Sequence, residues 1–156
     1  MLVDIVSKNG NLLLNIPQRP DGALDAECTW ILKGLARWIG VNGEGIQGTR
    51  PWKQAGEGPS RGAEGQFKEE AVNWTAEDFR FTEKAGAVYA FQMKWPEDRT
   101  ALIKNLASHR GPKVAGVRLL GSDANLPHEQ TDSGLKVRLP EKPTSEYAHG
   151  IHVRLG

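Results

Sequence analysis

An apolar run near the start of the chain restricts the fold more than any other stretch. Residues 12–16 read Leu-Leu-Leu-Asn-Ile, without the polar alternation of a strand that has one face in solvent. Such a run is typical of a strand covered on both faces, as in a parallel sheet flanked by helices. A buried helix also gives such a run, but Gly10 before it and Pro17 after it leave too few residues for a normal helix. We therefore predict a short central strand that ends at Asn15 or Ile16.

One long amphipathic helix is predicted after this strand. Asp25 has the side chain of an N-cap and Asn42-Gly43 is a typical stop, so we expect the helix to run from about residue 25 to 41. Lys33 and Arg37 fall on its polar side. The apolar side is wide and is expected to pack on the preceding strand. It contains Cys28, Ile31, Leu32, Leu35, Trp38 and Ile39.

The second half of the chain has the pattern of short strands and turns. Residues 53–70 are rich in Gly, Glu, Gln and Lys without periodicity, which predicts a loop or linker. From residue 78 onward, apolar residues alternate around Lys84-Ala85-Gly86 and again around Asp132-Ser133-Gly134, as in two hairpins. Roughly six or seven short strands at this spacing predict a small antiparallel β-sandwich.

The charge balance gives no reason to expect nucleic acid or an anionic membrane as a partner. Lys and Arg number 20 against 19 Asp and Glu, and the formal net charge is +1. The single cysteine, Cys28, excludes an internal disulfide and is expected to be a small core hydrophobe. No apolar run has the length of a membrane span, and no signal region opens the chain, so the compartment is unknown.

Ordered motifs carry a resemblance to a known family. Residues 2–15 are followed by Arg19-Pro20-Asp21-Gly22, then by Val41-Asn42-Gly43-Glu44-Gly45-Ile46 and by Gly48-Thr49-Arg50-Pro51-Trp52. In content, order and spacing these stretches resemble the α-L-fucosidases of glycoside hydrolase family 29. Residues 2–15 are similar to the segment that brings in the last strand of that family's barrel. The second half resembles the family's carboxy-terminal β-domain more weakly, at Arg80-Phe81-Thr82, Tyr89-Ala90, Leu119-Leu120-Gly121-Ser122-Asp123 and Leu139-Pro140-Glu141-Lys142-Pro143.

The resemblance implies an α+β chain in which the end of a (β/α)8 barrel precedes a small antiparallel β-sandwich. It places the last barrel strand and helix at residues 1–52, a loop or linker at 53–77 and the sandwich at 78–156. Family members are much longer, and their nucleophilic aspartate and acid/base carboxylate precede the matched stretch. The chain is therefore expected to be a fragment, the product of a truncated reading frame, or the product of a gene that has lost its front.

The activity implied by the resemblance is the hydrolysis of terminal α-L-fucosides with retention, for which two carboxyl groups stand roughly 5 Å apart. No carboxylate of this chain matches a family catalytic position. If the short chain is active, the candidates are Glu44, in a Gly-rich loop, and Asp4. Asp4 has no second acid or histidine nearby in sequence, and a charge at a helix surface or helix end is the simpler interpretation.

Three residues are candidates for contact with substrate. Asn15 falls at the carboxy-terminal end of the predicted barrel strand, where the active sites of barrels lie, although an asparagine that ties down the next loop fits equally well. Trp52 is suited to stacking on a sugar or to filling the seam between barrel and β-domain, and Arg50 precedes it by two residues. The four histidines are scattered, so neither a metal site nor a cofactor is expected.

Three functions stay open at this point. The chain is the noncatalytic carboxy-terminal part of a fucosidase, a sandwich that binds glycans or braces a partner, or a compact hydrolase that rebuilds a fucoside site across a dimer. The expected ligand is an α-L-fucosylated glycan or oligosaccharide. A lone apolar strand and a wide helix face need cover, so a homo-oligomer or another association that covers them is expected.

Overall fold

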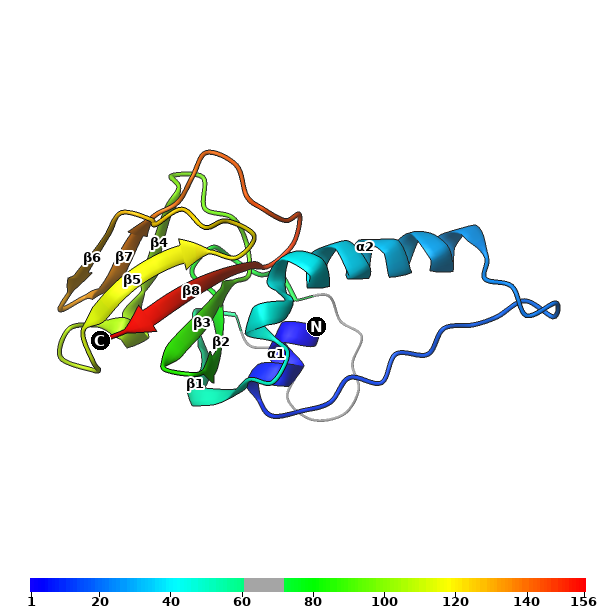
Figure 1. Cartoon of the computed structure of the whole chain (residues 1–156), viewed down its shortest axis with the longest axis horizontal. Helices are drawn as coiled ribbons and strands as arrows, with labels where there is room; N and C mark the ends of the chain where they lie inside the picture. Colours follow the sequence, from blue (N-terminus) through cyan, green and yellow to red (C-terminus); the bar gives the residue numbers. More distant parts are fainter. Residues whose placement is uncertain (61–71) are drawn as a thin grey trace.

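Two antiparallel sheets form the body of the molecule, and a long helix projects from it (Figure 1). The computed structural model describes residues 1–60 and 72–156. The helical elements are α1 (Leu2–Ser7), α2 (Ala26–Asn42) and the short 3-10 turns η1 (Gly43–Gly45) and η2 (Lys104–Leu106). The strands are β1 (Arg50–Glu57), β2 (Phe79–Lys84), β3 (Ala87–Gln92), β4 (Thr100–Ile103), β5 (Val114–Leu119), β6 (His128–Thr131), β7 (Gly134–Arg138) and β8 (His149–Leu155).

The larger sheet has the strand order β1-β2-β3-β8-β5, and the smaller sheet has the order β4-β7-β6. Each pair of neighbouring strands is antiparallel. The β2–β3 hairpin turns at Ala85 and Gly86, which have φ angles of 51° and 77° and so supply the left-handed conformation that a tight hairpin needs. The hairpin of β6 and β7 closes between Thr131 and Gly134. The antiparallel sandwich and both hairpins predicted from the sequence are confirmed.

Side chains that alternate along the central strands bury both faces of the larger sheet. Val88 and Ala90 belong to the main core between the two sheets, while Tyr89 and Phe91 belong to a second cluster on the outer face. On that outer face the sheet is covered by α1 and by the end of α2, where the rings of Trp38 and Phe91 lie 6.0 Å apart. The larger sheet is therefore the platform on which both helices sit.

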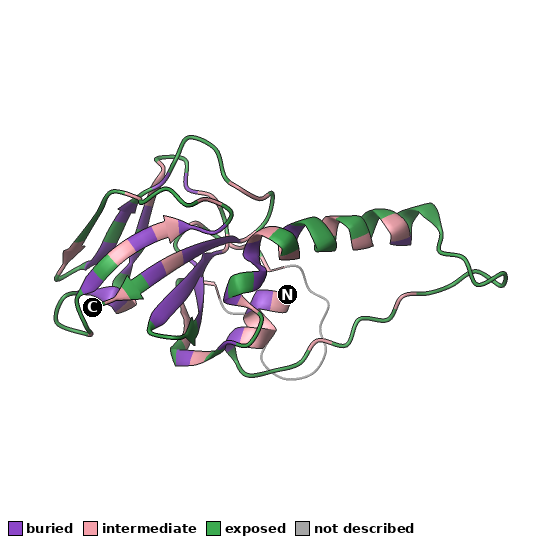
Figure 2. Cartoon of the chain, in the orientation of Figure 1, coloured by how far each residue is buried: buried purple, intermediate pink, exposed green. Residues whose placement is uncertain are grey.

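The predicted long helix is confirmed together with its cap. The backbone N–H of Cys28 donates to the carboxylate of Asp25 at 2.7 Å, which satisfies one of the free donors at the helix start. The packing of the helix differs from the expectation, because α2 covers the sheet only near its carboxy-terminal end (Figure 2). Further out, Trp30 is 65% exposed and Ile31 is 41% exposed.

The predicted strand at residues 11–16 is wrong. This stretch has no regular secondary structure and runs extended from α1 toward the far end of α2 (Figure 1). Leu13 is 85% exposed and Leu14 is 42% exposed. A strand needs neighbouring strands for its backbone N–H and C=O groups, and the described residues place none beside this one. The run is apolar as predicted, but among the described residues no sheet or helix buries it.

The predicted linker at residues 53–77 is wrong at its start. Residues 53–57 belong to β1, which pairs with β2. The pairing shifts between Pro51 and Gly56, and this bulge disturbs the alternation of side chains by which a strand is recognised in sequence. Residues 61–71 of the predicted linker lie outside the described residues. The other residue bounds given to the barrel end and to the sandwich stay a prediction.

Candidate functional site

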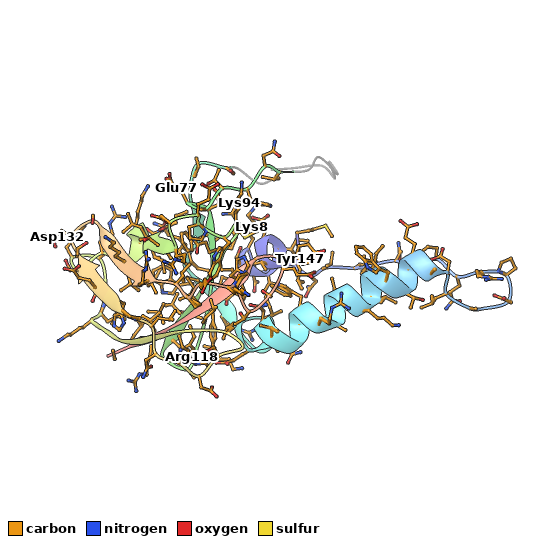
Figure 3. The ribbon with its side chains drawn as sticks, turned by 90° about the horizontal axis from the view of Figure 1, so that it is seen from above. Lys8, Glu77, Lys94, Arg118, Asp132 and Tyr147 are labelled. Atoms are coloured by element: carbon orange, nitrogen blue, oxygen red, sulfur yellow. The ribbon has the colours of Figure 1, made fainter. Side chains whose placement is uncertain are left out.

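A carboxylate with two fixed partners lies on the outer face of the larger sheet. Glu44, in η1, accepts hydrogen bonds from Arg118 of β5, whose Nη2 lies 2.7 Å from both carboxylate oxygens. Arg118 is labelled in Figure 3 among the side chains of the strands. The hydroxyl of Tyr89 in β3 donates to Oε1 of Glu44 at 3.0 Å. The Arg118 hydrogen bonds hold the pKa of Glu44 below its ordinary range, with help from Tyr89 and against the effect of partial burial. Glu44 is therefore a fixed anion at neutral pH.

Tyr89 and His152 complete this cluster, with their ring centroids 5.2 Å apart in an edge-to-face arrangement. Burial, together with the charge of Glu44, raises the pKa of Tyr89 to about 12. Burial, together with the charge of Arg118, lowers the pKa of His152. Tyr89 stays a neutral donor, and the charges of Glu44 and Arg118 neutralise each other. The arrangement favours a structural ion pair over acid–base catalysis, which needs a group poised to exchange its proton near the working pH.

Gly45, the residue after Glu44, packs so closely on the sheet that a larger residue does not fit there. A Cβ at Gly45 would lie 2.7 Å from Cζ of Phe91 and 3.0 Å from Cδ1 of Tyr89, so only glycine permits this approach to the sheet. The carbonyl of Gly45 accepts a hydrogen bond from the hydroxyl of Thr82 at 2.7 Å. The motif over residues 41–46 therefore forms the joint between α2 and the larger sheet.

Asp4 lies in a separate ion pair on α1. Its carboxylate accepts hydrogen bonds from Nε of Arg80 and, at 3.0 Å, from Nζ of Lys8. Burial alone would raise the pKa of Asp4, but the hydrogen bonds and charges of Arg80 and Lys8 outweigh burial and lower the pKa. Within the described contacts Asp4 and Glu44 share no partner, so the structure does not join the two candidate carboxylates into a catalytic pair. The contacts of Asp4 support the interpretation as a structural helix charge.

The three candidates for substrate contact lie in different environments and are not brought together. Asn15 is exposed in the extended segment that precedes α2. Arg50 is exposed at the start of β1, where its guanidinium contacts the carbonyl of Thr49 at 3.4 Å. Trp52 is only 8% exposed, and its ring packs against Phe81 in the main core at 5.2 Å between centroids. The position of Trp52 supports a packing role, because a ring buried in the core has no free face on which a sugar could stack.

Sequence reasoning missed an aromatic cavity of about 700 Å³ between α1, α2 and the sandwich. Four of the five tryptophans and two further ring side chains line it: Trp30, Trp38, Trp74, Trp95, Tyr147 and His149. His149 is 3% exposed and stands edge-on to Trp95 at 4.8 Å between centroids. Burial lowers the pKa of His149 to about 4. These residues come from distant segments of the chain, so no local sequence motif predicts that they line one cavity.

Neither a metal centre nor a membrane span is visible in the part of the chain that the structure describes. No three His, Cys, Asp or Glu side chains there are grouped so that they would hold a metal ion. The described helices are also too short or too polar to cross a bilayer.

Comparison with known families gives two matches in the same chain order as the motifs. A family model described as α-L-fucosidase matches residues 1–44. A second model, described as the α-L-fucosidase C-terminal domain, matches residues 72–155, which is more than half of the chain.

Individual relatives agree with the family matches. Human tissue α-L-fucosidase is 31% identical over 92% of this chain, and the rat protein is 29% identical over 94%. The chain spans only 27% and 28% of the lengths of these relatives. Most of each relative thus has no counterpart in the sequence described here.

Solved structures share the fold. The α-fucosidase of Thermotoga maritima superposes with a TM-score of 0.73 at 24% identity, over 97% of this chain and 32% of that structure. A family 29 α-L-fucosidase of Bacteroides thetaiotaomicron gives 0.71 at 18% identity, over 99% and 30%. The predicted α+β class, with a barrel end before a β-domain, is confirmed. The chain belongs to the α-L-fucosidases of glycoside hydrolase family 29 and corresponds to their carboxy-terminal part.

Proposed function

We propose that this chain serves as the carboxy-terminal part of an α-L-fucosidase that hydrolyses terminal α-L-fucosides of glycans with retention. The observation that carries the proposal is the order of the family matches, an α-L-fucosidase model over residues 1–44 and its C-terminal domain over 72–155. A covalent intermediate has been trapped on the family 29 enzyme from Bacteroides thetaiotaomicron, which is the behaviour of a retaining hydrolase.

In this proposal the chain braces the enzyme, and the chemistry lies outside it. Its two candidate carboxylates, Glu44 and Asp4, are each held by an arginine in a separate ion pair. A retaining mechanism needs one free nucleophilic carboxylate and one carboxyl group that can exchange its proton. The exposed Leu13, Leu14 and Trp30 form apolar surface that a barrel would cover. The chain's own contribution is then to position the barrel end on the sandwich.

The 156-residue chain alone is expected to release no aryl group from an aryl α-L-fucoside above the rate of a buffer blank. Intact mass is measured on the same sample to show that no longer species is present. Turnover abolished by Glu44→Gln or by Asp4→Asn would contradict the proposal and establish a compact hydrolase. Turnover that survives both changes would identify a contaminating glycosidase, and the assay is then repeated on repurified chain.

A chimera tests the bracing role directly. Residues 1–156 replace the matched carboxy-terminal region of human tissue α-L-fucosidase, and the human enzyme that merely lacks this region is the control. The chimera is expected to hydrolyse the aryl fucoside, and the truncated control is not. A chimera that melts cooperatively but has no turnover would overturn the proposal.

A further inference from the structure

Two hydrogen bonds attach α2 to the start of β8, and His149 lies between them in the chain. The carbonyl of Ala148 accepts from Nε1 of Trp38 at 2.8 Å. The backbone N–H of Gly150 donates to Oδ1 of Asn42 at 3.0 Å. Figure 1 shows the carboxy-terminal end of α2 beside the start of β8. These two hydrogen bonds form the α2–β8 joint, and a displacement of His149 would disturb both of them.

The side chain of His149 is buried within its own chain, and one of its ring nitrogens has no partner. Nδ1 of His149 forms no hydrogen bond with any of the described residues. Gln92 lies directly opposite on β3, and its Oε1 is also buried without a partner in the described part of the chain. Nε2 of Gln92 donates to the carbonyl of Ala76 at 2.8 Å, which fixes the orientation of the amide. Further chain packed against these side chains would only bury them more deeply.

A neutral imidazole fits this position, and a protonated one does not. Directly opposed residues of an antiparallel pair place their side chains on the same face of the sheet. A neutral His149 that carries its proton on Nδ1 can therefore offer it to Oε1 of Gln92. A protonated ring would add a full charge at a buried site where no carboxylate among the described residues is hydrogen-bonded to it. Burial accordingly lowers the pKa of His149 to about 4.

The charged groups around His149 do not compensate for a proton there. The titratable and charged groups that line the same cavity come from α1, from α2 and from the loops beside β3 and β8: the amino group of Met1, Arg37, Lys94, Glu146 and Tyr147. Glu146 is the one carboxylate among these described groups, and burial accounts for the lowered pKa of His149 without a contribution from their charges. His152 lies on the opposite face of β8, where its ring contacts Tyr89. A proton on His149 would therefore stay without a partner as long as the joint is closed.

We propose that His149 makes the α2–β8 joint sensitive to acid, so that uptake of a proton by its ring opens the joint and frees α2 from the sandwich. The protonated ring leaves its buried place beside Gln92, and the flanking hydrogen bonds of Ala148 and Gly150 open with it. All the groups concerned lie in this chain, so the inference goes beyond the proposed function and does not rest on it. In a fucosidase the same step would loosen the barrel end from the sandwich at low pH.

The pH range of the opening follows from the pKa of His149 in the two forms of the joint. In the open joint His149 has its ordinary pKa of 6.5, and in the closed joint its pKa is about 4. Between these two values the open form binds the proton and the closed form does not. The joint is therefore most stable above pH 6.5 and loses stability as the pH falls from 6.5 toward about 4. The equilibrium constant for opening is expected to rise about tenfold or more between about pH 7 and about pH 5.

Hydrogen exchange of the Gly150 N–H in the 156-residue chain, measured over the same pH range, tests the proposal. The protection factor of Gly150, relative to those of the β2–β3 hairpin, is expected to fall about tenfold or more toward the acid end. An NMR titration of the His149 ring in the folded chain is expected to give a pKa well below 6.5. Constant relative protection of Gly150 would overturn the proposal, as would a His149 ring that titrates at its ordinary pKa. Neither measurement involves fucoside hydrolysis, so a negative result here would leave the proposed function standing.

His149→Phe removes the titrating group and keeps a ring beside Trp95. In this variant the relative protection of the Gly150 N–H is expected to be the same at both ends of the pH range. His128→Phe, the same change at an exposed histidine of β6, is the matched control and is expected to keep the pH dependence of the natural chain. A pH dependence that survives His149→Phe would assign the effect to another group and overturn the proposal. If circular dichroism shows that His149→Phe does not fold, the ring titration of the natural chain decides.

Discussion

Asp78→Ala is expected to lower the free energy of unfolding by about 3 to 4 kcal/mol, because it removes a fully buried anion that several donors surround. The carboxylate of Asp78 accepts four hydrogen bonds, from N and Oγ of Ser60 at 2.8 and 2.7 Å and from N and Oγ1 of Thr75 at 2.7 and 2.8 Å. Without it, these donors lose their acceptor. Urea unfolding followed by tryptophan fluorescence measures the loss.

Asp98→Ala is the matched control for this variant. Asp98 is an exposed aspartate that accepts one backbone hydrogen bond, from Thr100 at 3.0 Å. Its removal is expected to cost less than about 1 kcal/mol, the usual range for one exposed hydrogen bond. Equal losses of unfolding free energy in the two variants would show that the buried hydrogen bonds of Asp78 stabilise the fold no more than one exposed hydrogen bond.

The contribution of Asp78 is also expected to depend on pH. Burial alone would raise the pKa of Asp78, but the hydrogen bonds from Thr75 and Ser60 outweigh burial and hold the pKa below its ordinary value of 3.8. A carboxylate with a lowered pKa stabilises the fold above its unfolded pKa, and this stabilisation is lost as the pH falls through the folded value. The stability difference between the natural chain and Asp78→Asn should therefore shrink below pH 3.8. A constant difference down to acid unfolding would contradict this linkage.

Elements whose signals are local were predicted well. The start of α2 is set by Asp25, which caps a backbone group only three residues away. The β2–β3 hairpin is set by the turn at Ala85 and Gly86, between strands that alternate regularly. In both cases the residues that decide the structure are neighbours in sequence.

Features that depend on distant partners were not predicted. The sequence makes Glu44, in a Gly-rich loop, a candidate catalytic residue, but its partners Tyr89 and Arg118 are 45 and 74 residues away. The apolar run at residues 12–16 has the composition of a buried strand, but a strand forms only where other strands accept its backbone hydrogen bonds. Residue composition does not supply those partners.

The aromatic cavity was missed for the same reason. Its tryptophans are spread from Trp30 to Trp95 along the chain and line one cavity only once α2 and the sandwich are placed beside each other. A hydrophobic pattern indicates which face of an element is apolar, but it does not indicate which distant face will lie opposite. The position of α2 on the sheet decides this, and the buried side chain of Asn42 at the helix end hydrogen-bonds to β8 and to Ser145 there.

Asn42→Ala is expected to lower the free energy of unfolding by about 2 to 4 kcal/mol, because Asn42 is fully buried and joins three segments. Its Nδ2 donates to the carbonyl of Trp38 at 3.2 Å and to Oγ of Ser145 at 3.3 Å. Its Oδ1 accepts from the backbone N–H of Gly150 at 3.0 Å. Removal of the amide leaves that N–H without its partner at the centre of the joint.

Hydrogen exchange distinguishes a local joint from a general loss of stability. In Asn42→Ala the N–H of Gly150 is expected to exchange faster than the N–H groups of the β2–β3 hairpin, because β8 loses its link to α2 while the hairpin keeps its own pairing. Asn125→Ala, at an exposed position, is the matched control. It should change neither the free energy of unfolding nor the exchange rate of the Gly150 N–H. If Gly150 stays as protected as in the natural chain, Asn42 does not hold α2 on the sheet. The orientation of α2 would then rest on the Glu44–Arg118 ion pair and on the packing of Trp38.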